Sequence, residues 1–322
     1  MITKEDLSFE MQKIAKRLNL ENIQGALYFP KYFQIETSRL CNAKCPYCAY
    51  DQWNKDVPFM SEDLFAKVVN ELERYAHWIE WVCLSRAGEP LLDKKIIERV
   101  YMLKQVGIKR VNLTTNAFLL NEEKIRRLLD VGLDEIMFSI DSIDKNEYEK
   151  IKVGLKFEKV LKNIELFFKL REEVNAKTIV RIRAVAPYDI ESAIGQSKLR
   201  KWEDYWNQFR KPNDRIYMKK PHNWGNQKEL VGYVPNIAAV YHPCILPWST
   251  LHVTAMGTAT LCPMDYDAIM NLGSVVLQSI KEIWDGVEVN KIRENHRNGM
   301  RNNIRFCEGC KLFDLDSRLE FD

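Results

Sequence analysis

Three thiols lie within eight residues of one another in the segment LCNAKCPYCAY, residues 40–50. Cys41, Cys45 and Cys48 follow directly on the apolar segment FQIET (33–37), which has the composition of a β-strand. A structural zinc ion or a fully ligated iron–sulfur cube binds four soft ligands. Three thiols therefore need either a fourth ligand from a distant part of the chain or a metal on which one coordination position stays open.

A second group of cysteines lies near the C-terminus. Cys244 and Cys262 are followed by the pair Cys307-x2-Cys310. The eighth cysteine, Cys83, stands alone in the strand-like segment IEWVCLS, where we expect it to be a small buried apolar side chain. Cysteines that are grouped in a chain without a secretory signal indicate metal binding rather than disulfides.

The composition limits the classes of protein to which the chain can belong. A chain of 322 residues that is 46% hydrophobic can bury a large core and is expected to form two domains. The 48 Lys and Arg residues nearly balance the 45 Asp and Glu residues, so no overall field favours a nucleic acid partner. No segment has the length of a membrane span, and the N-terminus lacks the apolar core of a signal peptide. We therefore expect a cytoplasmic protein that binds neither nucleic acid nor membrane.

Strand-like and helix-like segments alternate between the two cysteine groups. The predicted strands are residues 33–37, 79–85, 109–115, 135–141, 178–185 and 214–220. The predicted helices between them are residues 61–77, 93–107, 121–132, 157–174 and 199–209. This alternation predicts an α/β fold with a parallel sheet that curls into a partial (β/α)6 TIM-like barrel. The first three thiols then lie at the C-terminal ends of the strands, which form the working face of such folds.

Three regions are expected along the chain. Residues 1–30 form an N-terminal helical extension, residues 31–221 the barrel, and residues 222–322 a smaller α+β domain around the second cysteine group. In that domain we predict short strands and one helix around SIKEIWDGVEVNKIREN. The basic run KIRENHRNGMRNNIR (291–305) is predicted to be a solvated face.

The Cys41-x3-Cys45-x2-Cys48 motif after a first strand, with Tyr47 before the third cysteine, resembles the radical S-adenosylmethionine (SAM) superfamily. The resemblance implies a [4Fe–4S] cluster held by these three thiolates. Its fourth iron is left for the amino and carboxylate groups of SAM, which accounts for the open position. The alternative is a zinc site that takes its fourth ligand from far away.

Further segments resemble the SAM-binding motifs of this family in the same order. Gly88 and Glu89 in SRAGEPLL match its Gly-Gly-Glu-Pro motif, which implies that Glu89 binds the methionine ammonium of SAM. Asn116 in TTNAFLL and Ser139 in FSIDS match strand ends that face SAM. Lys152 in IKVG stands where the family often has an arginine for the SAM carboxylate, and it would act as a point charge.

Some positions depart from the family pattern or stay open. Arg86 and Ala87 replace the small residues that precede the Gly-Glu-Pro segment, and Ala117 replaces a glycine. Asp141, two residues after Ser139, is either a turn former at the sheet end or a site residue.

The second cysteine group resembles the SPASM/twitch auxiliary domain that many radical SAM enzymes carry. The segment from Cys244 to Cys262 has the pattern Cys-x12-Gly-x4-Cys, and the chain continues to FCEGC. A full SPASM domain has more cysteines and two clusters, whereas four thiolates ligate one auxiliary [4Fe–4S] cluster completely. The resemblance thus implies the shorter twitch form, with Cys244, Cys262, Cys307 and Cys310 as ligands. A structural zinc ion is the alternative.

The resemblance implies an enzyme that cleaves SAM to a 5′-deoxyadenosyl radical, which removes a hydrogen atom from an unactivated C–H bond. We expect a flavodoxin or ferredoxin as the reducing partner. An auxiliary cluster whose irons are all bound by the protein is suited to electron transfer, so we expect an oxidoreductase that removes two electrons. As in some family members, the expected substrate is a small molecule with a secondary alcohol, such as a sugar or aminocyclitol. Asp265, three residues after Cys262, is the candidate base.

Two other functions remain open at this point. A peptide maturase or epimerase is the enzymatic alternative, and an epimerase would use Cys83 as a hydrogen donor. The region before the first strand is short for the peptide-binding domain that many maturases carry, which favours a small molecule. An iron–sulfur electron carrier or a zinc-binding protein is the non-enzymatic alternative, and it has no use for the SAM motifs.

Overall fold

The computed structural model describes residues 4–186, 188–228 and 242–310. The chain divides into two compact units. Unit 1 comprises Met1–Ile35, Met60–Trp81 and His222–Asp322, and unit 2 comprises Glu36–Phe59 and Val82–Pro221. Each unit thus combines segments that are far apart in the sequence. The predicted domain ranges 1–30, 31–221 and 222–322 stay predictions.

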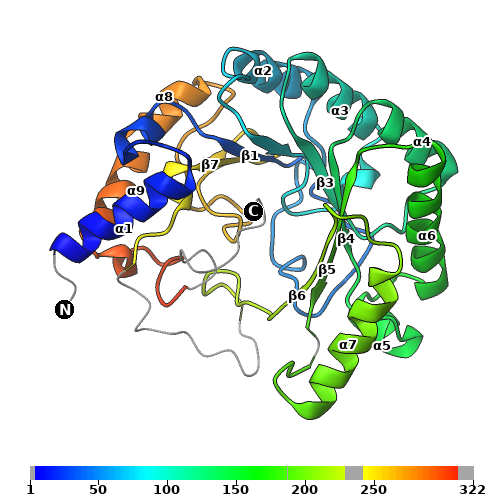
Figure 1. The fold of residues 1–322 in the computed structure, drawn as a ribbon. Coiled ribbons are helices and arrows are strands. Elements are labelled where there is room, and N and C mark those ends of the chain that lie inside the picture. Colours follow the sequence, from blue (N-terminus) through cyan, green and yellow to red (C-terminus); the bar gives the residue numbers. More distant parts are fainter. Residues whose placement is uncertain (1–3, 187, 229–241, 311–322) are drawn as a thin grey trace. The chain divides into compact units, whose positions relative to one another are not determined.

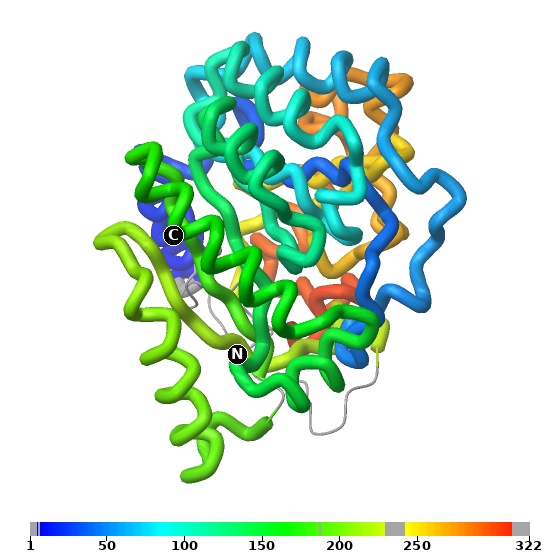
Figure 2. The backbone as a smooth tube through the Cα atoms, turned by 90° about the vertical axis from the view of Figure 1, so that its right-hand side faces the viewer, coloured from blue at the N-terminus to red at the C-terminus, as the bar shows by residue number. Residues whose placement is uncertain are grey.

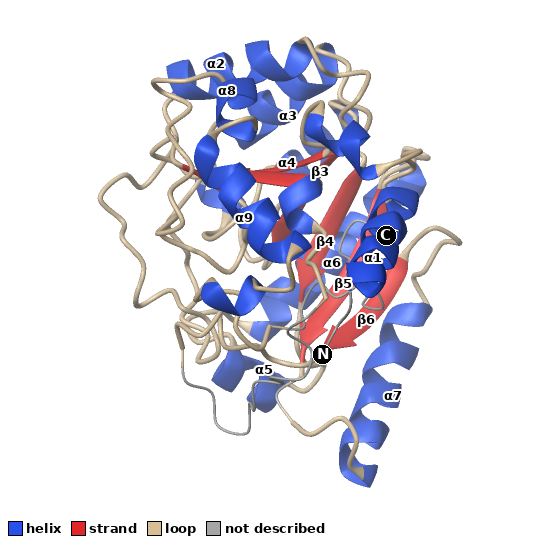
Figure 3. Cartoon of the chain, turned by 90° about the vertical axis from the view of Figure 1, so that its left-hand side faces the viewer, coloured by secondary structure: helices blue, strands red, loops and turns tan. Residues whose placement is uncertain are grey.

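Unit 2 is built on a parallel sheet. Its strands are β2 (Trp81–Cys83, of which the first residue belongs to unit 1), β3 (Val111–Thr115), β4 (Glu135–Ser139), β5 (Ile179–Val185) and β6 (Arg215–Lys219). Each strand pairs in parallel with the next, so their order in the sheet follows their order in the sequence. Figure 3 shows β3 to β6 side by side. These strands confirm the predicted ones, each within two residues at its start.

Three helices cover the same side of this sheet, as seen in Figure 1 and from outside in Figure 2. They are α3 (Ile96–Gln105), α4 (Glu122–Asp130) and α6 (Phe157–Glu173). The helices form because apolar side chains recur at helical spacing, and the resulting stripe is buried against the strands. Val100, Leu128 and Phe167 are fully buried in this layer.

Two further helices of unit 2 depart from the prediction. α5 (Lys145–Ile151) was not predicted, because seven residues give too short a periodic pattern. Asp144 begins it by accepting a hydrogen bond from the backbone N–H of Glu147. α7 (Ala193–Asn207) begins six residues before the predicted start, after the cap Ser192. Its tryptophans, Trp202 and Trp206, are buried as the packing prediction requires.

Unit 1 holds the first strand, β1 (Tyr32–Ile35), which pairs in parallel with β7 (Thr250–Val253). β7 pairs in turn with the antiparallel β8 (Ala259–Thr260). The helices of this unit are α1 (Lys4–Arg17), α2 (Glu62–Glu73), α8 (Ile280–Trp284) and α9 (Val287–Arg297). The sequence analysis did not predict that β1 takes a partner from the region of the second cysteine group.

The single helix predicted around residues 279–295 is wrong, because the structure has two helices there, α8 and α9. Gly286 lies between them in an extended conformation with a ψ of 161°. The last turn of α8 is held from outside the helix, since Arg293 Nη1 donates to Trp284 O at 3.0 Å. A glycine in a helix interior costs about 1 kcal/mol relative to alanine, and this tertiary contact favours the break.

Within the described residues, the structure contains no helix long and apolar enough to cross a membrane.

We predict that Asp214→Ala destabilises unit 2 by roughly 3–5 kcal/mol, because it leaves a buried guanidinium without its partner. Asp214 is 3% exposed and forms a bidentate ion pair with Arg171, with both N–O distances at 2.8 Å. It also accepts the backbone N–H of Val180 at 2.7 Å, at the start of β5. The free energy of unfolding in urea measures the effect.

The matched control is Asp204→Ala, which removes an exposed carboxylate from α7 in the same unit. It should change the free energy of unfolding by less than about 0.5 kcal/mol. Equal stabilities of the two variants would contradict the structural role of the Asp214–Arg171 pair.

Candidate functional site

The first three thiols lie in a loop of unit 2 that backbone contacts hold in place. Lys44 N donates to Val153 O at 2.9 Å, which ties the loop to the residue after Lys152. The indole N–H of Trp53 donates to Arg39 O at 3.1 Å and fastens the two ends of the loop together. Between these anchors, Cys48 N donates to Cys45 O at 2.9 Å and closes a turn.

The structure brings Cys41, Cys45 and Cys48 together. Burial raises the pKa of Cys41 to about 12, with smaller contributions from the charges of Glu89, Cys45 and Cys48. Burial also raises the pKa of Cys45, against the opposing charge of Lys152. In the protein alone, three thiolates in this loop would repel one another. They suit a group that brings its own positive charge, and an iron–sulfur cluster binds its cysteines as thiolates.

Among the described residues, no three His, Cys, Asp or Glu side chains form a group that could hold one metal ion. A mononuclear zinc site draws its ligands around a single point. In a [4Fe–4S] cube each thiolate binds a different iron, so the ligands lie further apart.

Gly88 allows the Gly-Glu-Pro segment to run against the backbone that enters the cysteine loop. A Cβ atom at this position would lie 2.4 Å from both Ser38 O and Leu40 O, too close for any side chain. The next residue closes the contact, since Glu89 N donates to Leu40 O at 2.7 Å. The close approach that demands glycine here is therefore one between two backbone segments.

The carboxylate of Glu89 is buried and organises the end of β3. Its Oε1 accepts from Thr115 Oγ1 at 2.7 Å and from Leu91 N at 3.1 Å, and its Oε2 accepts from Asn116 N at 2.8 Å. Burial raises the pKa of Glu89, and these hydrogen bonds oppose the rise. A carboxylate has about four acceptor positions, so Oε2 can accept one further donor such as an ammonium.

Asn116 and the unexpected Ala117 lie at the same strand end. Asn116 Nδ2 donates to Asn42 Oδ1 at 2.7 Å, which links this turn to the residue after Cys41. Ala117 has a φ of 61°, the left-handed conformation that accounts for the family glycine at this position. Its backbone is held on both sides, by Thr115 Oγ1 and by Asn163 Nδ2, at 3.0 and 2.9 Å.

Lys152 is buried and lies at the centre of a polar cluster rather than in solvent. Its ammonium Nζ lies 2.9 Å from Tyr47 Oη, 2.9 Å from Ser139 Oγ and 3.0 Å from Asp141 Oδ2. Burial alone would lower the pKa of Lys152, but Asp141 and Tyr47 outweigh it and hold the pKa well above its ordinary value. The structure thus brings three of the predicted SAM-binding residues together, with the ammonium charged.

Asp141 has one contact at the sheet end and two with predicted site residues, and its own role in the site stays a prediction. Its Oδ1 accepts the backbone N–H of Val185 at 2.7 Å, which is a structural role at the end of β5. Its Oδ2 accepts from Tyr47 Oη at 2.5 Å and pairs with Lys152. The carboxylate therefore joins the sheet end to the cysteine loop.

The second set of thiols lies in unit 1. Cys244 precedes a 3-10 turn (Leu246–Trp248), Cys262 follows β8, and Cys307 and Cys310 follow a second turn (Arg301–Asn303). Burial raises the pKa of Cys262 well above its ordinary value, and the charges of Cys307 and Cys310 add to the rise. Burial likewise raises the pKa of Cys307 to about 12. The same argument as for the first loop makes these thiols fit a cluster.

Two residues near these thiols were not predicted. His296 and Arg301 lie in the basic run that was predicted to be a solvated face, but they are only 1% and 2% exposed. Arg301 donates to the backbone carbonyls of His242 and Cys310. Burial lowers the pKa of His296 to about 3, with a smaller contribution from the charge of Arg301. The solvated-face prediction is therefore wrong for these residues. A histidine eleven residues before Cys307 was the only available signal.

Asp265 and Cys83 have structural contacts of their own. The buried carboxylate of Asp265 accepts from Thr260 Oγ1, Ile269 N and Met270 N at 2.8, 2.8 and 2.9 Å. It thus shapes the loop after Cys262, and its role as a base stays a prediction. Cys83 is 2% exposed and its Sγ donates to Ser85 O at 3.3 Å.

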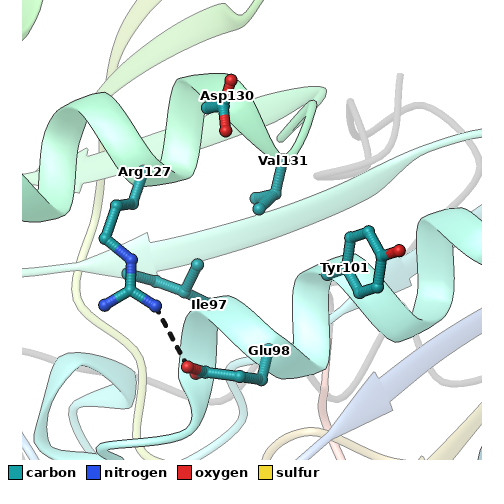
Figure 4. A pocket seen from close by; sticks show the side chains of 6 residues that line it. All are labelled: Ile97, Glu98, Tyr101, Arg127, Asp130 and Val131. Carbon is teal, nitrogen blue, oxygen red and sulfur yellow. Dashed lines mark hydrogen bonds and ion pairs between the residues drawn. The ribbon is translucent and has the colours of Figure 1, made fainter.

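A small pocket lies on the helical face of unit 2, away from these residues (Figure 4). It is lined by Ile97, Glu98, Tyr101, Arg127, Asp130 and Val131. Its volume of ≈ 210 Å³ is below the roughly 300–1,000 Å³ of small-molecule sites. The ion pair between Glu98 and Arg127, at 3.0 Å, spans it. It contains none of the predicted site residues, so we assign it no catalytic role.

Two family models match the chain, and each encloses one of the two sites. The radical SAM superfamily matches residues 35–182, which contain the first three thiols and all the predicted SAM contacts. An iron–sulfur cluster-binding domain, SPASM, matches residues 244–311, which contain the four thiols of unit 1. The chain therefore carries a radical SAM domain. More particularly, it combines this domain with a SPASM-type iron–sulfur cluster-binding domain, and the two domains account for the predicted cofactors, which are SAM, a [4Fe–4S] cluster and an auxiliary iron–sulfur cluster.

Known proteins resemble parts or all of the chain. A probable GTP 3′,8-cyclase from Methanococcus maripaludis is 36% identical over 134 residues, which are 41% of this chain and 44% of the relative. The chain thus spans less than half of the length of this curated relative.

Solved structures resemble the chain over most of its length. BtrN in complex with AdoMet and 2-DOIA has a TM-score of 0.59 at 17% identity, covering 88% of this chain and 93% of BtrN. The enzyme anSMEcpe with AdoMet and the Cp18Cys peptide has a TM-score of 0.62 at 15% identity, covering 91% and 93%. At these identities the likeness shows the fold, and it confirms the predicted α/β class with a partial TIM-like barrel.

We predict that Gly88→Ala prevents assembly of the first cluster while the second still forms. The new Cβ would overlap two carbonyl oxygens, so the backbone leading into the cysteine loop has to move. The iron content of the anaerobically reconstituted protein should fall by about half.

Gly25→Ala is the matched control, because a Cβ at Gly25 would meet the side chain of Leu20 at ordinary contact distances of 3.4 Å or more. Its iron content should equal that of the unsubstituted protein. Full iron content in Gly88→Ala would contradict the argument that this backbone contact positions the loop.

Proposed function

We propose that this radical SAM enzyme dehydrogenates a secondary alcohol of a small molecule such as a sugar or aminocyclitol. The observation that carries the proposal is the set of four thiols in unit 1. Cys244, Cys262, Cys307 and Cys310 give one ligand for each iron of a [4Fe–4S] cube, so no iron remains to bind a substrate. A cluster of this kind is suited to accept an electron. Among the outcomes that can follow hydrogen abstraction, oxidation of the substrate is the one that needs an electron acceptor of this kind.

Residues of unit 2 have defined roles in this proposal. When bound, SAM and the reduced first cluster supply a 5′-deoxyadenosyl radical that abstracts a hydrogen atom from the substrate. Cys41, Cys45 and Cys48 would hold the cluster, and Glu89 would provide an acceptor for the ammonium of SAM. Lys152 would supply positive charge for the carboxylate of SAM.

The remaining contacts of unit 2 position these groups. Asn116 links the turn after β3 to Asn42, next to the first thiol. Ser139 and Tyr47 hold the ammonium of Lys152 in place. Positioning of this kind lowers the barrier because the reacting groups no longer need to be ordered during the reaction.

A peptide maturase or epimerase remains the main alternative. The similar folds of BtrN and anSMEcpe were captured with 2-DOIA and with a peptide respectively, so the fold admits either class of substrate. The similarity to a probable GTP 3′,8-cyclase makes GTP a third substrate to test, although it covers 41% of this chain. Each alternative also requires a reductant, and we propose a flavodoxin or ferredoxin.

We predict about eight irons per chain in the anaerobically reconstituted protein, because two [4Fe–4S] clusters form. Replacement of Cys41, Cys45 and Cys48 by Ala should leave about four irons and abolish the formation of 5′-deoxyadenosine. Iron analysis and product chromatography measure the two effects. Stoichiometric zinc without iron in the unsubstituted protein would contradict the assignment of both sites.

We predict that turnover yields a product two mass units lighter than the substrate, with no deuterium from heavy water bound to the reacting carbon. Cys307→Ala should abolish this product and spare part of the SAM cleavage, because only the electron acceptor is lost. The candidate substrates are sugars and aminocyclitols, the Cp18Cys peptide and GTP, and mass spectrometry identifies the product.

Cys83→Ala separates oxidation from epimerisation. Cys83 is the only cysteine outside the two groups. For a dehydrogenase, Cys83→Ala should retain turnover and cost about 1 kcal/mol in stability for the lost buried thiol. A product of unchanged mass that carries solvent deuterium and disappears in Cys83→Ala would establish an epimerase instead.

A further inference from the structure

His296 of α9 lies between two of the four thiols of unit 1. Its side chain is buried, and its ring meets that of Trp248 edge-on, at 6.0 Å between centroids and an angle of 89°. The imidazole therefore packs against an aromatic neighbour. Its two nitrogens point to two different cysteines, Cys244 and Cys307.

The hydrogen bond at Nδ1 determines which nitrogen carries the proton. The backbone N–H of Cys244 donates to His296 Nδ1 at 3.0 Å. Because Nδ1 accepts this bond, it carries no proton, and the neutral ring must carry its proton on Nε2. An imidazole that is oriented by one such bond presents its other nitrogen in a fixed direction.

The protonated nitrogen faces the sulfur of Cys307. Nε2 lies 3.7 Å from Cys307 Sγ, which is within the distance of an N–H···S hydrogen bond. A donor at this distance withdraws electron density from a thiolate. Hydrogen bonds to the sulfur ligands are among the factors that set the reduction potential of an iron–sulfur cluster.

We propose that His296 donates a hydrogen bond from Nε2 to the Cys307 thiolate and thereby raises the reduction potential of the auxiliary cluster. It acts through a cluster ligand, so it is a positioning and tuning residue. A higher potential makes the cluster a better acceptor for the electron that the substrate radical must lose. This inference rests on the proposed assignment of the four thiols to one cluster, and it does not depend on the identity of the substrate.

A neutral donor suits this place better than a charged one. The ring is buried, and a protonated imidazole there would be next to Arg301, whose guanidinium donates to Cys310 O. A neutral N–H group stabilises the extra electron of the reduced cluster without the cost of burying another cation. The same ring also satisfies the backbone N–H of Cys244, so a single side chain serves two cluster ligands.

Two substitutions separate the two contacts of the ring. The side-chain oxygen of Asn in His296→Asn can replace Nδ1 as acceptor, but its amide is too short to reach Cys307. The longer amide of Gln in His296→Gln can replace Nε2 as donor. The background is the Cys41, Cys45 and Cys48 to Ala variant, in which the auxiliary cluster is the only one expected. Redox titration followed by electron paramagnetic resonance measures its potential.

The expected result is a more negative potential in His296→Asn and a potential near that of the parent in His296→Gln. A tenfold change in the ratio of reduced to oxidised cluster corresponds to a shift of about 59 mV for one electron. The control His252→Asn replaces another buried histidine of unit 1, which pairs with Gln34, and should leave the potential unchanged. A potential in His296→Asn equal to that of the parent would overturn the proposal.

A measurement on the parent keeps the test independent of variant folding. In the parent labelled with ¹⁵N-histidine, pulsed electron resonance should detect a weak nitrogen coupling and a proton that exchanges in heavy water. Strong nitrogen coupling would make His296 a direct ligand, and no coupling would place it outside the cluster; either result overturns the proposal. A background variant that binds no iron would instead refute the cluster assignment itself.

Discussion

Burial of a thiolate costs free energy unless positive charge lies beside it, and both sites of this protein hold several partly buried thiols. Burial raises the pKa of Cys41, Cys45, Cys244, Cys262 and Cys307, so the folded chain by itself favours their protonated forms. The opposing charges of Lys152 and Arg301 compensate only in part. The architecture around each loop is therefore built to hold ligands that become stable as thiolates when the irons of a cluster are bound.

The polar cluster around Lys152 likewise places a positive charge beside partly buried thiols. Its ammonium is held by Tyr47, Ser139 and Asp141, so the positive charge next to the cysteine loop is fixed in position. Asp141 in turn accepts the backbone N–H of Val185, the last residue of β5. The charge near the first cluster is thus set by the end of the sheet and does not depend on a mobile surface chain.

The sequence was sufficient to predict the features that depend on local pattern. The periodicity of the apolar residues and the composition of each segment predicted the strands from β2 to β6. The spacing of Cys41, Cys45 and Cys48 predicted the first site. The pairing of β1 with β7 was beyond prediction, because four-residue strands carry no information about their partners. The break at Gly286 depends on a hydrogen bond from Arg293, a contact that exists only in the folded state. His296 was missed for a similar reason, since a basic run gives no sign of burial.

The pairing of β1 with β7 has a consequence for how the chain folds. Gln34 and His252 touch across this pair although 218 residues separate them in the sequence. Contacts of such high sequence separation form late, because closing the long loop costs chain entropy before the contact can stabilise the fold. On the ribosome, β1 emerges long before its partner is synthesised, while the strands of unit 2 emerge consecutively. Unit 2 can therefore complete its sheet and its cysteine loop first. Unit 1 contains the four thiols of the second group, and it can fold only after nearly the whole chain has been synthesised.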